Sequence, residues 1–394
     1  MNSKKKPSIF IGLIVFMAVL LLLILVAAPM QLAWGMWGLA LTELMILACA
    51  VVPALILKWD LREIFKVSRP SARQIFGVLV LWLGAYIAVL AIVMITTYLF
   101  PKGMGYASNE MLKFIRSVSF PLALFIMAVM PAVCEEALHR GLILHTFGGK
   151  NKWVTIMGMG LIFGIFHLDP YRFLGAGVLG TVLTLIMIET RNLALPVLFH
   201  FINNSVSSLS ALTSEPGLEP VRVSLSAVGI SLVMASAVPF LLVAGSRLLR
   251  GRAENRSNPV SKRTKFIAAA ATVMLAAAGI GIISAYFAQE PLFETSFSGG
   301  VNRDTPPHNL EFAVPEDGSY LIDLSIQGDG VITTMIIVNS RGEEVFNASG
   351  MTLTLNGSIE LEAGDYLITL THDTDSADYM NVSVDILIKM LSAD

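Results

Sequence analysis

Ionisable and amide side chains interrupt three long apolar stretches of this chain. Six of them follow one another along the sequence: Glu135, Glu136, Arg140, His167, His200 and Asn204. An ionisable residue at membrane depth usually faces the interior of a helical bundle and marks a functional site, because lipid cannot solvate it. Carboxylates and imidazoles can activate a water molecule, either directly or with a metal ion. These residues therefore predict a hydrolytic centre inside a membrane.

The spacing of the first cluster separates its two glutamates. Neighbouring residues on a helix point about 100° apart, so Glu135 and Glu136 cannot share one role. Glu136 and Arg140 stand four residues apart in the favourable order and should pair on one face of the helix. That pair leaves Glu135 free to face the reacting groups, and the alternative is a same-face pair of Glu135 with His139.

The other two clusters contribute imidazoles and an amide. His200 and Asn204 lie four residues apart, so they share a helix face and suit the stabilisation of a developing oxyanion. His167 is a candidate ligand or proton carrier. The structural alternatives are a hydrogen bond between helices for a lone histidine and a purely structural Glu136–Arg140 pair. We expect structural or surface roles for the other titratable groups considered: Glu43, His139, His145, His308 and His372.

Known hydrolase motifs narrow the chemistry. The sequence has no His-Glu-x-x-His zinc motif, no Gly-x-Ser-x-Gly elbow and no phosphate-binding loop. Without a recognisable serine or cysteine nucleophile, the remaining chemistry is attack by an activated water molecule.

Composition identifies the class of protein. The chain has 394 residues, of which 55% are hydrophobic and only 14% charged, and this balance is typical of a polytopic membrane protein. A formal net charge of -2 without a basic domain argues against nucleic acid as a partner. Two cysteines cannot supply a disulfide framework or a zinc-finger set.

About eight or nine apolar segments are long enough to span a bilayer of roughly 30 Å. The nine candidates are 8–29, 34–57, 75–100, 118–147, 153–168, 173–188, 193–211, 222–248 and 265–288. Basic residues follow every even-numbered span, which predicts a cytoplasmic N-terminus in the cell membrane. With nine spans, the C-terminus lies on the extracytoplasmic side.

The C-terminal segment 290–394 has a different pattern. Apolar and polar residues alternate there, as in half-buried strands, between turns marked by glycine. Two stretches each place a glycine turn just before a tyrosine, at Tyr320 and Tyr366. About 100 residues with such frequent turns predict a β-sandwich.

The chain therefore divides into a helical membrane bundle and an all-β domain. We expect N-terminal spans over 1–74, a catalytic core over 75–212, further spans with a basic cytoplasmic loop over 213–289, and an extracytoplasmic sandwich over 290–394.

The ordered motifs resemble the CPBP family of intramembrane proteases, which includes the type II CAAX prenyl endopeptidases and bacterial Abi proteins. Glu-Glu-x-x-x-Arg at 135–140, Phe-x-x-x-His at 163–167 and His-x-x-x-Asn at 200–204 carry the resemblance. It implies that Glu135 is the general base and that His167 holds or activates the water. It assigns His200 and Asn204 to the oxyanion, with Glu136 and Arg140 supporting the site.

The resemblance also sets expectations about cofactor and substrate. The substrate would be a membrane-associated peptide or protein within the lipid bilayer. The family is named as metalloproteases, and His167, His200 and Glu135 would complete a three-ligand zinc site, but a glutamate-and-water mechanism fits the same residues. The chain departs from the family at His139, where an apolar or aromatic residue is expected, and in its β-domain.

Two alternatives to an endopeptidase come from other classes. One is a catalytically silent scaffold whose outer β-domain binds an envelope partner. The other is a transporter that relays protons through its buried Glu and His residues, but the sequence shows no inverted repeat of broken helices. The complete set of three motifs favours the endopeptidase over the scaffold.

Overall fold

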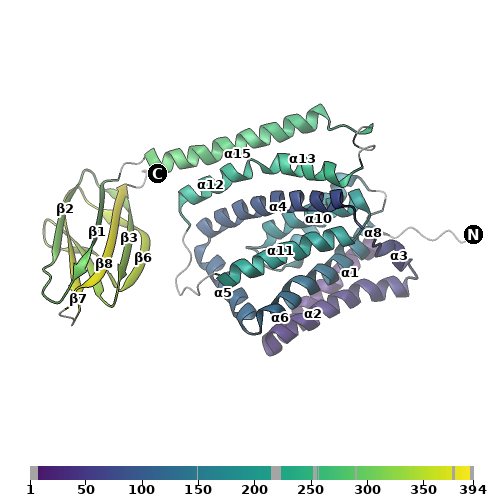
Figure 1. Ribbon diagram of the computed structural model, residues 1–394, viewed down its shortest axis with the longest axis horizontal. Helices are drawn as coiled ribbons and strands as arrows, with labels where there is room; N and C mark the ends of the chain where they lie inside the picture. Colours follow the sequence, from purple (N-terminus) through teal and green to yellow (C-terminus); the bar gives the residue numbers. More distant parts are fainter. Residues whose placement is uncertain are drawn as a thin grey trace, which may run out of the picture. The chain divides into compact units, whose positions relative to one another are not determined.

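The computed structural model of the chain (Figure 1) describes residues 8–148, 150–213, 223–251, 255, 257–288, 291–374 and 378–390. The chain forms two compact units, Met1–Ile283 and Ser284–Asp394. The first unit is helical and the second is built mainly from strands. This arrangement confirms the predicted combination of a membrane bundle and a β-domain.

The helical unit begins with a hairpin. Its parts are α1 (Ile9–Leu22), the wider π-helical turn η1 (Leu23–Ala27) and α2 (Ala28–Ile56). A straight helix of these 48 residues would be roughly 70 Å long, more than twice the apolar thickness of a bilayer. The chain instead reverses at Gly35, whose φ of 54° is open to glycine and strained for other residues. Gln31 then donates a hydrogen bond to Thr42 across the reversal.

The remaining helices lie side by side or end to end in the bundle shown in Figure 1. Short helices flank some of the long ones, and π-helical turns interrupt the third stretch. Their bounds are α3 (Leu61–Ile64), α4 (Ala72–Leu99), α5 (Pro101–Arg116), α6 (Phe120–Leu124), η2 (Phe125–Val129), α7 (Met130–Glu136), η3 (Ala137–Ile143), α8 (Leu144–Thr146), α9 (Lys152–Phe166), α10 (Phe173–Thr190), α11 (Ala194–Thr213), α12 (Leu225–Ala235), α13 (Val238–Leu249) and α15 (Lys262–Ala288).

Six helical stretches in the described part of the chain are long and apolar enough to cross a membrane. The difference from the nine expected spans has three causes. The hairpin Ile9–Ile56 is one continuous stretch instead of two. At 15 residues, α9 is about 22 Å long, shorter than the bilayer core. The third cause is α11, which is not among the six and carries His200 and two asparagines.

Close packing of α9 on α10 positions one motif residue. A Cβ built on Gly180 of α10 would lie only 2.6 Å from the Cβ of Phe163 on α9. Small residues at such a crossing let two membrane helices approach without a hydrophobic driving force. Phe163 is therefore held in the centre of the unit, where it is buried.

Eight antiparallel strands form the second unit. Their bounds are β1 (Phe293–Val301), β2 (His308–Val314), β3 (Gly318–Gly328), β4 (Ile332–Asn339), β5 (Glu344–Gly350), β6 (Thr352–Leu361), β7 (Gly364–Asp373) and β8 (Met380–Met390). They make two four-stranded sheets, ordered β1-β8-β3-β6 and β2-β7-β4-β5. Alternate residues of both sheets enter one apolar core, as Ile322 and Leu324 do from β3. The alternating pattern thus correctly predicted a β-sandwich-like unit.

The two glycine-then-tyrosine stretches have the same local structure. The hydroxyl of Tyr320 donates to the carbonyl of Glu316 at 2.8 Å, and that of Tyr366 donates to the carbonyl of Glu362 at 3.0 Å. Each tyrosine buries its ring in the core and hydrogen-bonds back four residues to the preceding turn. The repeated glycine-tyrosine pattern therefore corresponds to the same turn before β3 in one sheet and before β7 in the other.

His308 and His372 are not the surface residues expected from the sequence. Both are half-buried, their rings lie 5.8 Å apart, and the ring of Phe297 lies 4.4 Å from His308. Nδ1 of His372 also lies 3.1 Å from the hydroxyl of Thr333. Burial, followed by the nearby His308, lowers the pKa of His372.

Candidate active site

The stretch that carries both glutamates is an irregular helix. Wider π-helical turns, η2 and η3, precede and follow α7, and such turns occur frequently at functional sites. Pro131 in the first turn of α7 has no N–H to donate to the carbonyl of Met127. That carbonyl instead accepts a hydrogen bond from Nδ2 of Asn204 at 3.1 Å. The irregular helix and α11 are thereby joined beside the motif residues.

Glu136 is the centre of a buried network. Its Oε1 accepts a hydrogen bond from Nη1 of Arg140 at 2.8 Å, as the spacing of the two residues predicted. The same oxygen lies 2.9 Å from Nδ1 of His200 on α11. Glu136, Arg140 and His200 are 0%, 1% and 5% exposed. The carboxylate therefore neutralises the guanidinium and also orients the imidazole.

Arg140 is held on three sides. Its Nη2 donates to the carbonyl of Gly180 at 2.9 Å, and its guanidinium lies 4.5 Å from the centre of the Phe163 ring. A cation over an aromatic face in a dry interior is a favourable contact. The Glu136–Arg140 pair thus fixes the relative positions of η3, α9 and α10.

Glu135 is buried but takes no part in that network. Its Oε2 has no hydrogen-bond partner among the described residues, and only 8% of the residue is exposed. The carboxylate lies close enough to Glu43 of α2 for their negative charges to repel each other. Oε2 of Glu43 is likewise buried without a partner. Sequence reasoning gave Glu43 a structural role with no partner and so missed this proximity.

His167 caps the end of α9. Its Nδ1 lies 2.9 Å from the carbonyl of Phe163, so this nitrogen carries the proton of a neutral ring and leaves Nε2 as an acceptor. The Phe163 ring lies 4.9 Å from the His167 ring and 5.9 Å from the His200 ring. Phe163, which the sequence showed only as part of a motif, therefore separates and orients the two catalytic candidates.

Asn204 has a fixed amide orientation. Its Oδ1 accepts from Asn203 while its Nδ2 donates to Met127. An amide nitrogen carries two N–H groups, so one of them stays available to a bound substrate. His200 and Asn204 lie on one face of α11 but have different partners. Glu136 binds the imidazole, and the main-chain carbonyl of Met127 binds the amide.

His139 packs inside the unit, as expected. It is fully buried, with its ring edge-on to Phe163 and Phe166 and its Nδ1 2.8 Å from the carbonyl of Glu135. The imidazole thus occupies the space of the aromatic or apolar residue that the family pattern favours. Nε2 is buried without a partner among the described residues.

The arrangement of these side chains bears on the zinc hypothesis. In the residues that the structure describes, no three or more His, Cys, Asp or Glu side chains form a group that could hold a metal ion. Glu135, His167 and His200 therefore do not fit a three-ligand zinc site as they stand here. The zinc hypothesis stays a prediction.

Comparison with known proteins finds a family model that matches the segment carrying this site. Residues 117–206 match the family model described as type II CAAX prenyl endopeptidase Rce1-like. The matched segment runs from before α6 into α11 and contains all six polar motif residues. No curated protein matches the chain. The match supports the resemblance to CPBP proteases that the motifs indicated.

Proposed function

We propose that this chain, whose residues 117–206 match the Rce1-like family model, is an intramembrane endopeptidase that hydrolyses peptide bonds with an activated water molecule. One observation carries the proposal. Of the two adjacent glutamates, Glu136 binds Arg140 and His200 through Oε1, whereas the carboxylate of Glu135 is buried and forms no ion pair or side-chain hydrogen bond with any residue that the structure describes. A carboxylate held in this way can accept a proton.

The first step uses Glu135 as the general base. Its carboxylate takes a proton from water while the water oxygen bonds to the carbonyl carbon of the substrate. His167 offers Nε2 as an acceptor that orients the second hydrogen of that water, because its Nδ1 is bound to Phe163. The product of this step is a tetrahedral intermediate with a negative oxygen and a protonated Glu135.

The second step needs hydrogen-bond donors at the new oxyanion. In the imidazolium form of His200, Nδ1–H stays bound to Glu136 and Nε2–H donates to the oxyanion. Asn204 adds its free amide N–H. When the C–N bond breaks, the protonated Glu135 returns its proton to the leaving amine, so the enzyme ends in its starting state.

The substrate of this chemistry is a membrane-associated peptide or protein. The site is buried within the helical unit, and the matched family takes its name from prenylated C-terminal peptides. We propose a cell-membrane location with the N-terminus in the cytoplasm and the β-unit outside, where it would bind an envelope partner. Labelling of S298C and S340C in intact cells tests this orientation, because both serines are exposed, and labelling only after lysis would overturn it.

Comparison of membrane peptides from cells with the wild-type chain and with the Glu135→Ala variant tests the function. Peptides with a new terminus should be present with the wild type and absent with the variant. Glu360→Gln, which changes an exposed carboxylate of the β-unit, is the control and should retain the wild-type peptides. Identical peptide sets from the wild type and Glu135→Ala would contradict the proposal.

A further inference from the structure

We propose that a cavity at one end of the helical unit binds the phosphate of an anionic lipid headgroup. The cavity has a volume of about 390 Å³ and is lined by residues of α3, η3, α8, α9 and α10 and of the loops between them. Its lining includes Arg140 but none of the four proposed catalytic residues, Glu135, His167, His200 and Asn204. The inference is therefore independent of the proposed peptidase activity.

The charge of the cavity favours an anion. Its lining includes Arg140, Lys150, Lys152 and Arg191, against the single carboxylate of Glu63. Lys152 is already paired with Glu189, whose carboxylate also binds Arg250 at 2.7 Å and joins α9, α10 and the end of α13. Lys150 and Arg191 are exposed and form no ion pair with any residue that the structure describes. These two side chains give the mouth of the cavity a net positive charge.

Arg140 is one of the residues that line the cavity. Two of its nitrogens are bound to Glu136 and Gly180, but its Nε is buried and has no partner within the described part of the chain. A buried N–H without an acceptor is costly. Phosphate oxygens are strong acceptors for guanidinium groups. The Arg140 side chain is fully buried, so a phosphate would be held at the mouth by Lys150 and Arg191, and Arg140 would add positive charge beneath it without direct contact.

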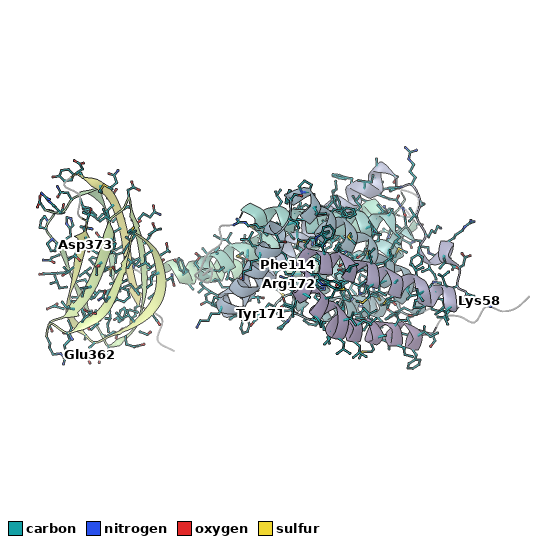
Figure 2. The ribbon with its side chains drawn as sticks, turned by 90° about the horizontal axis from the view of Figure 1, so that it is seen from below. Lys58, Phe114, Tyr171, Arg172, Glu362 and Asp373 are labelled. Atoms are coloured by element: carbon teal, nitrogen blue, oxygen red, sulfur yellow. The ribbon has the colours of Figure 1, made fainter. Side chains whose placement is uncertain are left out.

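The walls indicate a lipid as the source of the phosphate. Leu144, Phe147, Met187 and Ile188 line the cavity between the cations, so an acyl chain or glycerol backbone would be in apolar contact there. Figure 2 shows Lys58, beside α3, at the opposite end of the helical unit from Tyr171 and Arg172. Lys150 and Arg191, from the loops after α8 and α10, line the same cavity as Glu63 and Ile64 of α3, so these basic loops lie at the Lys58 end. Basic pockets between membrane helices on such a side suit anionic headgroups.

Native mass spectrometry of the full chain in detergent tests the inference. Phosphatidylglycerol and phosphatidylcholine with the same acyl chains are titrated against the wild type and against K150Q/R191Q. The wild type should retain phosphatidylglycerol preferentially. The double variant should bind it about tenfold to thirtyfold more weakly, since each cation near an anionic surface contributes about 1 kcal/mol. K262Q/R263Q, which removes two exposed cations at the start of α15, is the matched control and should bind like the wild type.

Three results would overturn the proposal. One is equal retention of the two lipids by the wild type, and another is an equal loss in both double variants, which would reduce the effect to general surface charge. The third is displacement of phosphatidylglycerol by millimolar inorganic phosphate, which would make free phosphate the ligand. If the double variant does not fold, K150Q alone provides the comparison, and it should show a smaller loss that K262Q does not share.

Discussion

The two units of this chain differ in how they treat buried polar atoms. In the described part of the β-unit, one buried side-chain atom lacks a hydrogen-bond partner, Nε2 of His372. The helical unit leaves several such atoms within one region, on Glu43, Glu135, Glu136, His139 and Arg140. A native fold satisfies nearly all buried polar groups, so a cluster of exceptions requires an explanation. The unpartnered atoms of the helical unit therefore lie at and beside the motif residues, where our proposal places the chemistry.

Backbone regularity follows the same division. The sheets pair in continuous antiparallel register, with one irregularity between Ile337 and Val338. In the helical unit, π-helical turns flank the two glutamates, and Gly35 reverses the first helix. Two of the three π-helical turns in the described residues, η2 and η3, flank the glutamates, which is expected when function competes with local stability, whereas η1 and Gly35 belong to the N-terminal hairpin.

Replacement of Glu136 by alanine should have the largest effect on the fold. Arg140 would be left as a buried charge without its partner, which costs about 3–5 kcal/mol. We expect a large loss of stability in a denaturant titration of the full chain in detergent micelles. The double variant E136A/R140L removes both charges and should recover much of the loss. If E136A alone is as stable as the wild type, the network is not structural and the contrast between the two glutamates is wrong.

Replacement of Leu324 by alanine should destabilise the β-unit alone. The side chain is fully buried in the sandwich core, and a cavity of this kind costs about 2–5 kcal/mol. Limited proteolysis should cut within 290–394 at lower temperature, while cleavage of substrate by the helical unit stays unchanged. A parallel loss of activity would show that the β-unit takes part in the chemistry. Leu321→Ala, at a partly exposed position of the same strand, is the control.

Replacement of Gly35 by alanine should have a moderate effect on the hairpin. A residue with a Cβ is strained at a φ of 54° and ψ of -126°, at a cost of about 1–3 kcal/mol. No atom lies near enough to clash with the added carbon, so the cost reports backbone strain alone. Thermal unfolding of the full chain should show the shift, and an unchanged midpoint would contradict the reversal at this residue. Gly251, also in open space, is the control position.

A fall in pH should produce the smallest of these effects, a loss of stability of the β-unit. The pKa of His372 is lowered in the folded state, so the unfolded chain binds the proton more readily. Stability is therefore fully present above the unfolded pKa of about 6.5 and is lost as pH falls towards the folded value, by at most about 1.4 kcal/mol per pH unit. Proteolysis of the β-unit at pH 7 and pH 5 should show this loss, and H372Q should reduce it. An equal acid sensitivity in H372Q would assign the effect to other groups.

Local patterns in the sequence predicted the parts of the fold that depend on neighbours along the chain. The alternation in β3 predicted its inward residues, and the spacing of Glu136 and Arg140 predicted their ion pair. Ordered motifs also identified the matched segment. These features need only the periodicity of a strand or a helix, and that periodicity is visible in the sequence.

Contacts between distant segments could not be predicted in the same way. His200 binds Glu136 across 64 residues, and Glu43 approaches Glu135 from the N-terminal hairpin. Both depend on how helices pack, which no local spacing encodes. The close approach of α9 to α10 depends on Gly160 and Gly177, which face each other across the two helices. The pairing of His308 with His372 likewise required the sheet register.

The central claim is that Glu135 is the general base while Glu136 holds the site together, and the rate of cleavage by E135Q tests it most directly. The measurement uses a peptide identified in the membrane comparison and the full chain in detergent, with stability recorded on the same samples. We predict a fall in rate of about 10²–10⁴-fold or more with unchanged stability, because the amide cannot accept the proton but fills the same space. Undiminished cleavage by E135Q would contradict this assignment of the two glutamates.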